Sequence, residues 1–304
     1  MRSYIPIAYD RKYKLDLPEN HRFPMIKYEL LPKKLISKGI SSQTDFFQPG
    51  LADINQLLEV HEKNYILKLK NLKLTKSEIR KIGFPLSDKL IEREMIITNG
   101  TIKGAIKALE QKVSFNIAGG THHSFSDRGE GFCLLNDQAV SAQNLIKNHN
   151  IKKILIIDLD VHQGNGTASI FKSNDSVYTF SIHGSKNYPF RKEKSDLDIP
   201  LEDNTEDDLY LNILNKTLPV LINKVKPNFI FYLSGVDIMK SDKLGRLSLS
   251  IEGCKERDKI VFSNCKKNDI PVQCSMGGGY SQDIDLIVDA HFNTFKTAKE
   301  IFIN

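Results

Sequence analysis

Three side chains that can bind a metal recur at alternate positions in one segment of the chain. They are Asp158, Asp160 and His162, and the apolar run 154–159 leads into them. Because side chains alternate faces with a period of two in a strand, the three are expected to point the same way. Two carboxylates on one face repel each other unless a cation lies between them, and an imidazole adds a neutral metal ligand. The alternative is a hydrogen-bonded turn with a capping Asp, but the pattern favours a metal site.

A catalytic zinc site needs a third protein ligand and keeps one open position. Asp237 is the best candidate, since it follows the apolar run 229–233 and its neighbours carry no charge. Alone, such an Asp is more often a helix cap, but beside Asp160 and His162 a ligand is favoured. Asp242 is a weaker candidate, because its segment, 240–245, has the composition of an exposed turn.

Two further motifs supply groups for acid–base chemistry and for stabilising an oxyanion. His122 and His123 are adjacent in a Gly-containing loop, where each imidazole needs a hydrogen-bond partner if it is buried. Asp158 could be one such partner, and a His beside a metal can act as general base. Tyr280 follows three glycines, and its phenol stays protonated at neutral pH and can donate to an oxyanion. The alternatives are a surface loop for the His pair and a flexible turn before a core Tyr.

The elements that must position these groups alternate along the chain. Short apolar runs are expected to be strands at 115–118, 154–159, 177–182, 229–233 and 272–276. Apolar residues at helical spacing indicate helices within 57–69, 102–109 and 139–146. This alternation predicts an α/β fold of three layers, in which helices cover both faces of a central, mainly parallel sheet. We expect one domain over residues 1–304.

The chemical motifs directly follow predicted strands, so a ligand is expected at the carboxyl ends of the sheet. The polar stretch 184–204 is expected to be a long loop, and loops of that length are often functional.

The composition excludes several classes of protein. Hydrophobic residues make up 40% of the 304 residues, and the net charge is +6. No apolar run approaches the ~18 residues that span a bilayer, so we expect a cytoplasmic enzyme without a membrane partner. The basic surplus is spread along the chain without a clustered basic and aromatic face, which argues against nucleic-acid binding. None of the four cysteines forms a C-x-x-C pair, which argues against a thiolate zinc site. The sequence carries no indication of the oligomeric state.

Together these motifs resemble the histone deacetylase family of the arginase–deacetylase fold, over nearly the whole chain. The resemblance extends to the segments 21–25, 60–65, 131–133 and 136–137. The segments 162–166 and 186–192 resemble a class IV-like bacterial branch. The resemblance implies zinc-dependent removal of acyl groups from lysine side chains of proteins.

The resemblance also implies a metal set and a proton-transfer set. Asp160, His162 and Asp237 would bind one Zn²⁺, and these mixed N/O ligands also suit Fe²⁺ or Co²⁺. His123 would be the principal general base and then acid. His122, hydrogen-bonded to Asp158, would be its electrostatic companion.

Other residues are assigned to the substrate and to a structural ion by the same resemblance. Tyr280 would polarise the acyl carbonyl. Gly131 would accept the substrate amide proton, Phe132 would line the acyl-lysine tunnel, and Gly278 would also contact the substrate. Asp158 and Ser181 would hold a structural K⁺. Asn136 is expected to cap the helix that follows it.

Three positions depart from relatives on this fold. Asn165 stands where class I members carry an Asp behind the general base, and a neutral amide should raise the pKa of His123 less. Lys27 aligns with an Arg near an internal channel, and Lys lacks the planar fork of Arg. Met239 stands where arginases carry the second carboxylate of an Asp-x-Asp pair, which favours one metal over two.

Two alternatives to a protein deacylase remain open on the sequence. The first is an amidohydrolase for small acetylated amines such as polyamines; acidic residues at the tunnel rim would favour it, and an open rim would favour protein lysines. The second is a catalytically silent module that binds acyl-lysine, against which the intact zinc set and Tyr280 argue. The resemblance leaves the acyl chain open, from acetyl to long-chain acyl groups.

Overall fold

The computed structural model describes residues 4–303 and places all eight strands of this part in one parallel sheet. The strand order is β2-β1-β3-β8-β7-β4-β5-β6. The strands are β1 (Ile7–Ala8), β2 (Phe46–Phe47), β3 (Val113–Asn116), β4 (Ile154–Asp158), β5 (Val177–Gly184), β6 (Leu197–Leu201), β7 (Phe229–Leu233) and β8 (Val272–Ser275).

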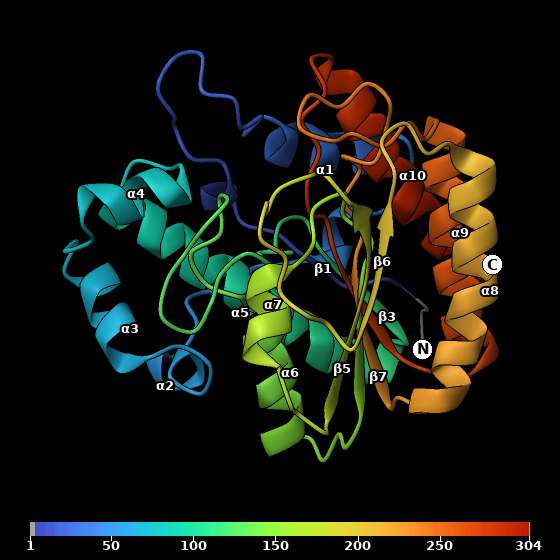
Figure 1. The fold of residues 1–304 in the computed structure, drawn as a ribbon, viewed down its shortest axis with the longest axis horizontal. Helices are drawn as coiled ribbons and strands as arrows, with labels where there is room; N and C mark the ends of the chain where they lie inside the picture. Colours follow the sequence, from blue (N-terminus) through green and yellow to red (C-terminus); the bar gives the residue numbers. More distant parts are fainter. Residues whose placement is uncertain (1–3, 304) are drawn as a thin grey trace.

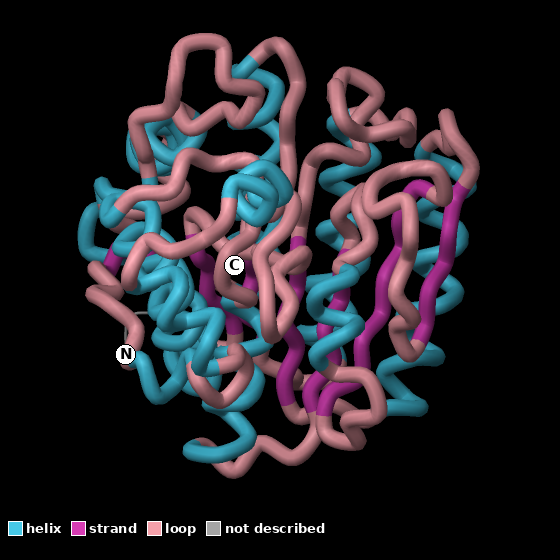
Figure 2. The backbone as a smooth tube through the Cα atoms, turned by 60° about the vertical axis from the view of Figure 1, so that its left-hand side comes forward, coloured by secondary structure: helices cyan, strands magenta, loops and turns pink. Residues whose placement is uncertain are grey.

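Helices cover both faces of this sheet (Figures 1 and 2). The first layer contains α5 (Asp88–Gln111), α6 (Asp137–Asn148) and α7 (Asn165–Ile170). The second layer contains α1 (Lys27–Ser37), α8 (Asp207–Val225), α9 (Ile251–Lys267) and α10 (Ile284–Phe302). The short helices α2 (Ile54–Leu57), α3 (Lys63–Lys70) and α4 (Lys76–Ile82) lie beyond α5, and the 3₁₀ turns are η1 (Arg11–Tyr13) and η2 (Gln43–Asp45).

The central strands are apolar throughout because helices cover them on both sides. Every residue of β3, β4, β7 and β8 is buried. The predicted three-layer α/β fold with a parallel sheet is therefore confirmed, and each of the five predicted strands is present. Helix α6 begins as expected, since the Asn136 side chain accepts a hydrogen bond from the Ala139 N–H.

Three local predictions were incomplete or wrong. The stretch 184–204 is not one loop, because it contains edge strand β6, in which only Leu201 is buried, so no continuous apolar run marks it. The stretch 57–69 is not one helix: α2 and α3 divide it. The two-residue strands β1 and β2 are too short to give a pattern. No helix of residues 4–303 is long and apolar enough to cross a membrane.

Candidate active site and metal centre

The polar motifs meet at the carboxyl ends of the four central strands β3, β8, β7 and β4. The loops that follow these strands are joined by backbone hydrogen bonds: the Leu159 N–H donates to the Leu233 carbonyl (3.1 Å), and the Gly277 N–H donates to the Gly119 carbonyl (3.3 Å). Segments that are far apart in the sequence therefore deliver their side chains to one place, as predicted from the motifs that follow the strands.

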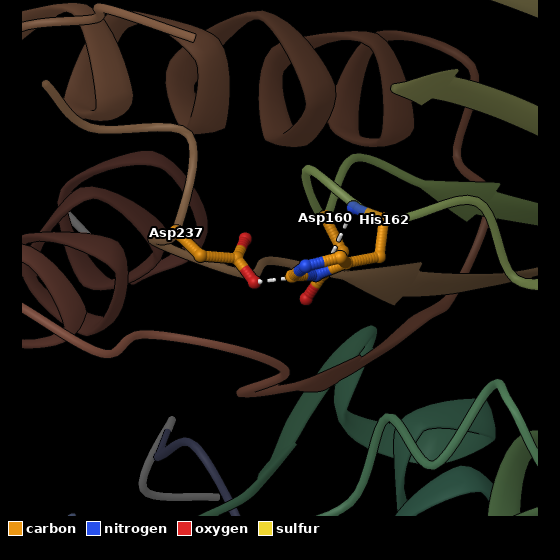
Figure 3. Close-up of side chains that lie close together, drawn as sticks. All are labelled: Asp160, His162 and Asp237. Atoms are coloured by element: carbon orange, nitrogen blue, oxygen red, sulfur yellow. Dashed lines mark hydrogen bonds and ion pairs between the residues drawn. The ribbon is translucent and has the colours of Figure 1, made fainter. Parts of the chain in front are cut away.

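Asp160, His162 and Asp237 form a buried cluster at this edge. Figure 3 shows the three side chains facing one another from the loops after β4 and β7. Nδ1 of His162 lies 3.0 Å from Oδ1 of Asp160 and 3.2 Å from Oδ2 of Asp237. One donor atom from each residue can be chosen so that all three lie within 4.8 Å of one another. This spacing suits three ligands around one ion.

The electrostatics of the cluster fit a cation. Burial and the neighbouring Asp160 raise the pKa of Asp237 to about 7. Burial alone would lower the pKa of His162, but hydrogen bonds to the two carboxylates raise it to about 10. Two buried carboxylates require a positive charge beside them. A divalent cation would supply that charge, and two oxygens and one nitrogen are ligands that zinc accepts.

Backbone amides orient the two carboxylates of the cluster. The Gly278 N–H donates to Oδ2 of Asp160 (2.8 Å), and the Val161 N–H donates to Oδ1 of Asp237 (3.0 Å). A Cβ atom at Gly278 would lie 1.9 Å from Oδ2 of Asp237, so no larger residue fits there. The predicted substrate residue Gly278 is therefore placed against the metal-site candidates.

The two adjacent histidines have different partners, as the sequence led us to expect. Nδ1 of His122 lies 2.7 Å from Oδ2 of Asp158, and Nδ1 of His123 lies 2.7 Å from Oδ1 of Asn165. Burial acts to lower the pKa of His122, but the Asp158 and Asp160 carboxylates outweigh burial and raise it. Burial, together with the two neighbouring imidazoles, holds the pKa of His123 well below its ordinary value. His122 therefore holds a proton more readily than His123 does.

Strand β4 ends at Asp158, so the two-residue period does not continue to His162. Asp158 faces His122, whereas Asp160 faces His162 and Asp237. The expectation that Asp158, Asp160 and His162 share one strand face was therefore incomplete, because the chain leaves the sheet before Asp160.

Tyr280 lies beside this cluster with its ring among aromatic neighbours. Its ring centroid is 5.8 Å from that of Phe23, 6.0 Å from that of Phe132 and 6.5 Å from that of His162. Its backbone N–H donates to Oδ2 of Asp242 (2.6 Å). Burial raises the pKa of the Tyr280 phenol well above its ordinary value, so the hydroxyl keeps its proton.

Two cavities meet at these residues. The inner cavity has a volume of about 40 Å³ and the outer chamber about 410 Å³. Both are lined by His123, Gly131, Phe132, His162 and Tyr280. A substrate that enters through the outer chamber therefore meets the reactive groups at the boundary with the inner cavity.

Gly131 and Phe132 form one wall of this boundary, and both have positive φ angles, +53° and +67°. A Cβ atom at Gly131 would lie 2.7 Å from the His123 ring, so glycine lets the chain pass close to that imidazole. The Phe132 ring packs on Phe23 and Phe84, with centroids 5.1 Å apart in each pair.

Asp158 and Ser181, the predicted K⁺ ligands, are register partners on β4 and β5. They line a small cavity of about 10 Å³. The Ser181 hydroxyl also lies 2.9 Å from Nδ1 of His183.

Sequence reasoning assigned no role to four residues that shape the site, although two of them, Asp137 and Tyr188, lie in segments that carried the family resemblance. Asp137 accepts hydrogen bonds from the Gly120 and Thr121 N–H groups, at 3.0 and 2.8 Å, and so holds the loop before the two histidines. Tyr188 packs edge-on against His123, with centroids 4.9 Å apart, and its hydroxyl donates to Glu130. An aromatic residue in a polar loop was the available signal for Tyr188.

The third is Arg257, a fully buried cation on α9. Its guanidinium donates to the Leu159, Gly235 and Ser234 carbonyls and pairs with Asp258 at 2.8 Å. It thereby ties together the two loops that carry the metal-site candidates. An Arg-Asp pair within an apolar helical face was its signal.

The fourth is Arg93, which lines the inner cavity. The sequence directed attention to Lys27 instead, as the residue that aligns with an Arg near an internal channel. Lys27 is buried, and its Nζ donates to the Gly277 carbonyl (3.3 Å) and lies 5.6 Å from the centroid of Tyr280. Burial lowers its pKa to about 8. Lys27 thus supports the glycine loop.

Residues 21–295 match the family model described as histone deacetylase domain. The chain belongs to the histone deacetylase family. It is 40% identical to an uncharacterized protein of Picosynechococcus sp., over 98% of this chain and 99% of that protein. It is 30% identical to histone deacetylase 2 of Arabidopsis thaliana, over 91% of this chain and 75% of that protein. It is 28% identical to the acetoin utilization protein AcuC of Staphylococcus aureus, over 90% and 76% of the two chains.

Solved structures show the same histone deacetylase fold. An HDAC homologue complexed with SAHA superposes with a TM-score of 0.83 at 24% identity, covering 98% of this chain and 88% of that one. An HDAC homologue from Aquifex aeolicus gives a TM-score of 0.82 at the same identity and coverage. The predicted family and its arginase–deacetylase-like fold are confirmed, and family membership supports deacetylase activity in general.

Proposed function

We propose that this protein is a zinc-dependent hydrolase that removes short acyl groups from lysine side chains of proteins, and that residues 1–304 act as one deacetylase domain. One observation carries the proposal: a buried Asp-His-Asp cluster lies beside two differently paired histidines and a tyrosine, where two cavities meet. Such a convergence of metal ligands, a base and an oxyanion donor is what amide hydrolysis requires.

Asp160, His162 and Asp237 are the proposed ligands of one Zn²⁺, and the same donors suit Fe²⁺ or Co²⁺. When bound, such an ion polarises a carbonyl and lowers the pKa of a coordinated water. Met239 leaves no second carboxylate for an arginase-type metal pair.

His123 is the proposed general base and acid. The Asn165 amide oxygen can only accept a hydrogen bond from Nδ1 of His123, so Nδ1 carries the ring proton. Nε2 therefore keeps its lone pair and can take a proton from the attacking water. The protonated ring can then give that proton to the departing amine. His122 is held by Asp158 and adds positive charge next to His123, which favours proton release at the later step.

Tyr280 is the proposed oxyanion donor, since its phenol keeps its proton and lies beside the cluster. Gly131, as the acceptor of the substrate amide N–H, and Phe132, as the wall of the lysine tunnel, are also proposals. We further propose that Asp158 and Ser181 contribute to a structural K⁺ site.

The inner cavity favours a short acyl group. A cavity needs ~10–15 Å³ for each water it holds, so about 40 Å³ has room for about three water-sized groups. An acetyl group has three heavy atoms and fits this space, whereas a myristoyl chain does not.

A side-by-side activity panel tests the proposal. Peptides with acetyl-, butyryl-, octanoyl- and myristoyl-lysine are compared with acetylated polyamines, with and without chelator. We expect the highest kcat/KM for acetyl-lysine, loss of activity on chelation and recovery with Zn²⁺. Turnover of none of these amides would overturn the proposed reaction, and faster release of myristoyl than of acetyl would overturn the assignment of the acyl group.

A further inference from the structure

The mouth of the outer chamber is lined by basic side chains from four separate segments. These residues, which we call the basic collar, are Arg22, Lys81, Lys186, Lys243 and Arg246. The described residues include no Asp or Glu in the lining of this chamber. Because the collar is assembled from distant parts of the chain, no single basic run of the sequence contains it.

Few carboxylates offset the charge of the collar. Nζ of Lys186 lies 3.6 Å from the Glu202 carboxylate, and Nη1 of Arg246 lies 3.1 Å from the Asp203 carboxylate. The side chains of Lys186 and Arg246 are both more than half exposed. Pairs of this kind are weak and exchange partners readily. Among residues 4–303, no carboxylate lies within 4.0 Å of the charged groups of the other three collar residues. The guanidinium of Arg22 lies 5.0 Å over the Phe132 ring.

Two acidic residues, Glu130 and Asp242, hydrogen-bond to residues that line the chamber. Glu130 accepts hydrogen bonds from Arg128 and from the Tyr188 hydroxyl, both at 2.9 Å. Asp242 accepts the backbone N–H groups of Leu244, Gly245 and Tyr280. The lining itself carries five cationic side chains and no carboxylate, which gives the mouth of the chamber a positive charge.

We propose that the substrate is an acyl-lysine in an acidic stretch of polypeptide, with Asp or Glu within two residues on either side. This proposal rests on the proposed deacylase function and names its substrate class. Five cations placed around a chamber of about 410 Å³ match several carboxylates spaced along a peptide better than one charge on a small molecule. The Phe190 side chain at the same mouth is 88% exposed and offers an apolar contact to the peptide.

The collar also disfavours the polyamine alternative on charge. An acetylated polyamine keeps at least one ammonium group, which would approach unpaired cations in the chamber. Like charges in such a position are unfavourable and slow the encounter. The acidic rim that would favour a polyamine is absent from the part of the chain that the structure describes.

The test measures kcat/KM for acetyl-lysine peptides that differ only at two positions on each side, filled with Glu, Gln or Lys. N-acetylspermidine is assayed alongside. The Glu peptide should exceed the Gln peptide roughly tenfold at low salt, because three unpaired cations each contribute about twofold. The Lys peptide and N-acetylspermidine should be slower than the Gln peptide. Salt at ~0.5 M should remove most of the difference.

Two variants with the same net charge assign the effect to the collar. Lys81→Gln with Lys243→Gln should reduce the Glu-to-Gln ratio to about twofold, since one unpaired cation remains. Lys152→Gln with Lys216→Gln alters two exposed lysines outside the chamber and should keep the wild-type ratio. Lys81→Glu with Lys243→Glu should make the Lys peptide faster than the Glu peptide.

The outcomes separate this proposal from the function on which it rests. Equal kcat/KM for the three peptides, faster turnover of the Lys peptide or of N-acetylspermidine, or an unchanged ratio in the Lys81/Lys243 variant would each overturn the acidic-substrate proposal and leave deacylation intact. Turnover of none of these substrates would remove the proposed function and the acidic-substrate proposal with it.

Discussion

Arg257 should position the metal site without touching it. Its guanidinium donates to the Leu159 carbonyl (3.2 Å), the Gly235 carbonyl (2.5 Å) and the Ser234 carbonyl (3.2 Å), and it pairs with Asp258. Leu159 precedes Asp160, and Gly235 lies two residues before Asp237. Replacing Arg257 by Met removes this donor from three carbonyls in a fully buried place and leaves Asp258 with only the Tyr232 and Thr294 hydroxyls as donors.

The magnitude follows from those contacts. Removing one partner of a buried ion pair costs about 3–5 kcal/mol of stability. Losing the group that fixes both ligand loops should weaken zinc binding by about tenfold or more, as for other groups that orient metal ligands. Urea unfolding of the zinc-free protein and competition with a chelator measure the two effects separately.

Phe262→Ala is the matched control, since Phe262 lies on the same helix and is fully buried. A buried Phe→Ala change costs about 3–5 kcal/mol but leaves the loop carbonyls bound. We expect equal losses of stability and a weaker zinc affinity only in Arg257→Met. Identical zinc affinity in the two variants would refute the positioning role of Arg257.

Three further predictions concern proton transfer and pH. His123→Ala should lower kcat by ~10²–10⁴, whereas His122→Ala should cost less and shift the pH–rate profile; a larger loss for His122→Ala at every pH would exchange their roles. Tyr280→Phe should lower kcat by ~10²–10³ while bound zinc and KM stay near wild type; a lower melting temperature with unchanged kcat would identify a core Tyr instead. Burial lowers the pKa of His61 to about 4, whereas the pKa of an unperturbed histidine is about 6.5. The neutral buried ring therefore contributes fully to the free energy of unfolding above pH 6.5. This contribution is lost as the pH falls from 6.5 to 4, by about 3 kcal/mol in all. The free energy of unfolding of His61→Gln should fall less steeply over that range than that of wild type, and equal slopes would contradict this assignment.

The sequence predicted the parts of the molecule that local chemistry determines. Central strands are buried on both faces, so β4 and β7 appear as apolar runs, and the motifs after them mark the sheet edge. Edge strand β6 has one buried residue and left no such run. Groups that act across the fold were missed for a related reason: the importance of Arg257 depends on carbonyls in two loops far away along the chain.

Tunnel geometry also depends on long-range packing. The sequence indicated Phe132 as a wall residue, but the size of the inner cavity follows from side chains of several helices and loops. The basic collar is the clearest case, because its members come from four segments that are far apart in the sequence and only the fold brings them together.

The central claim is that Asp160, His162 and Asp237 hold one catalytic metal ion. The most direct measurement is metal content and acetyl-lysine turnover on the same preparations of wild type, Asp237→Asn and the exposed control Asp269→Asn. We predict about one zinc per chain with turnover in wild type and the control, and loss of both in Asp237→Asn. Two tightly bound metals in wild type, or full zinc and full turnover in Asp237→Asn, would contradict the account.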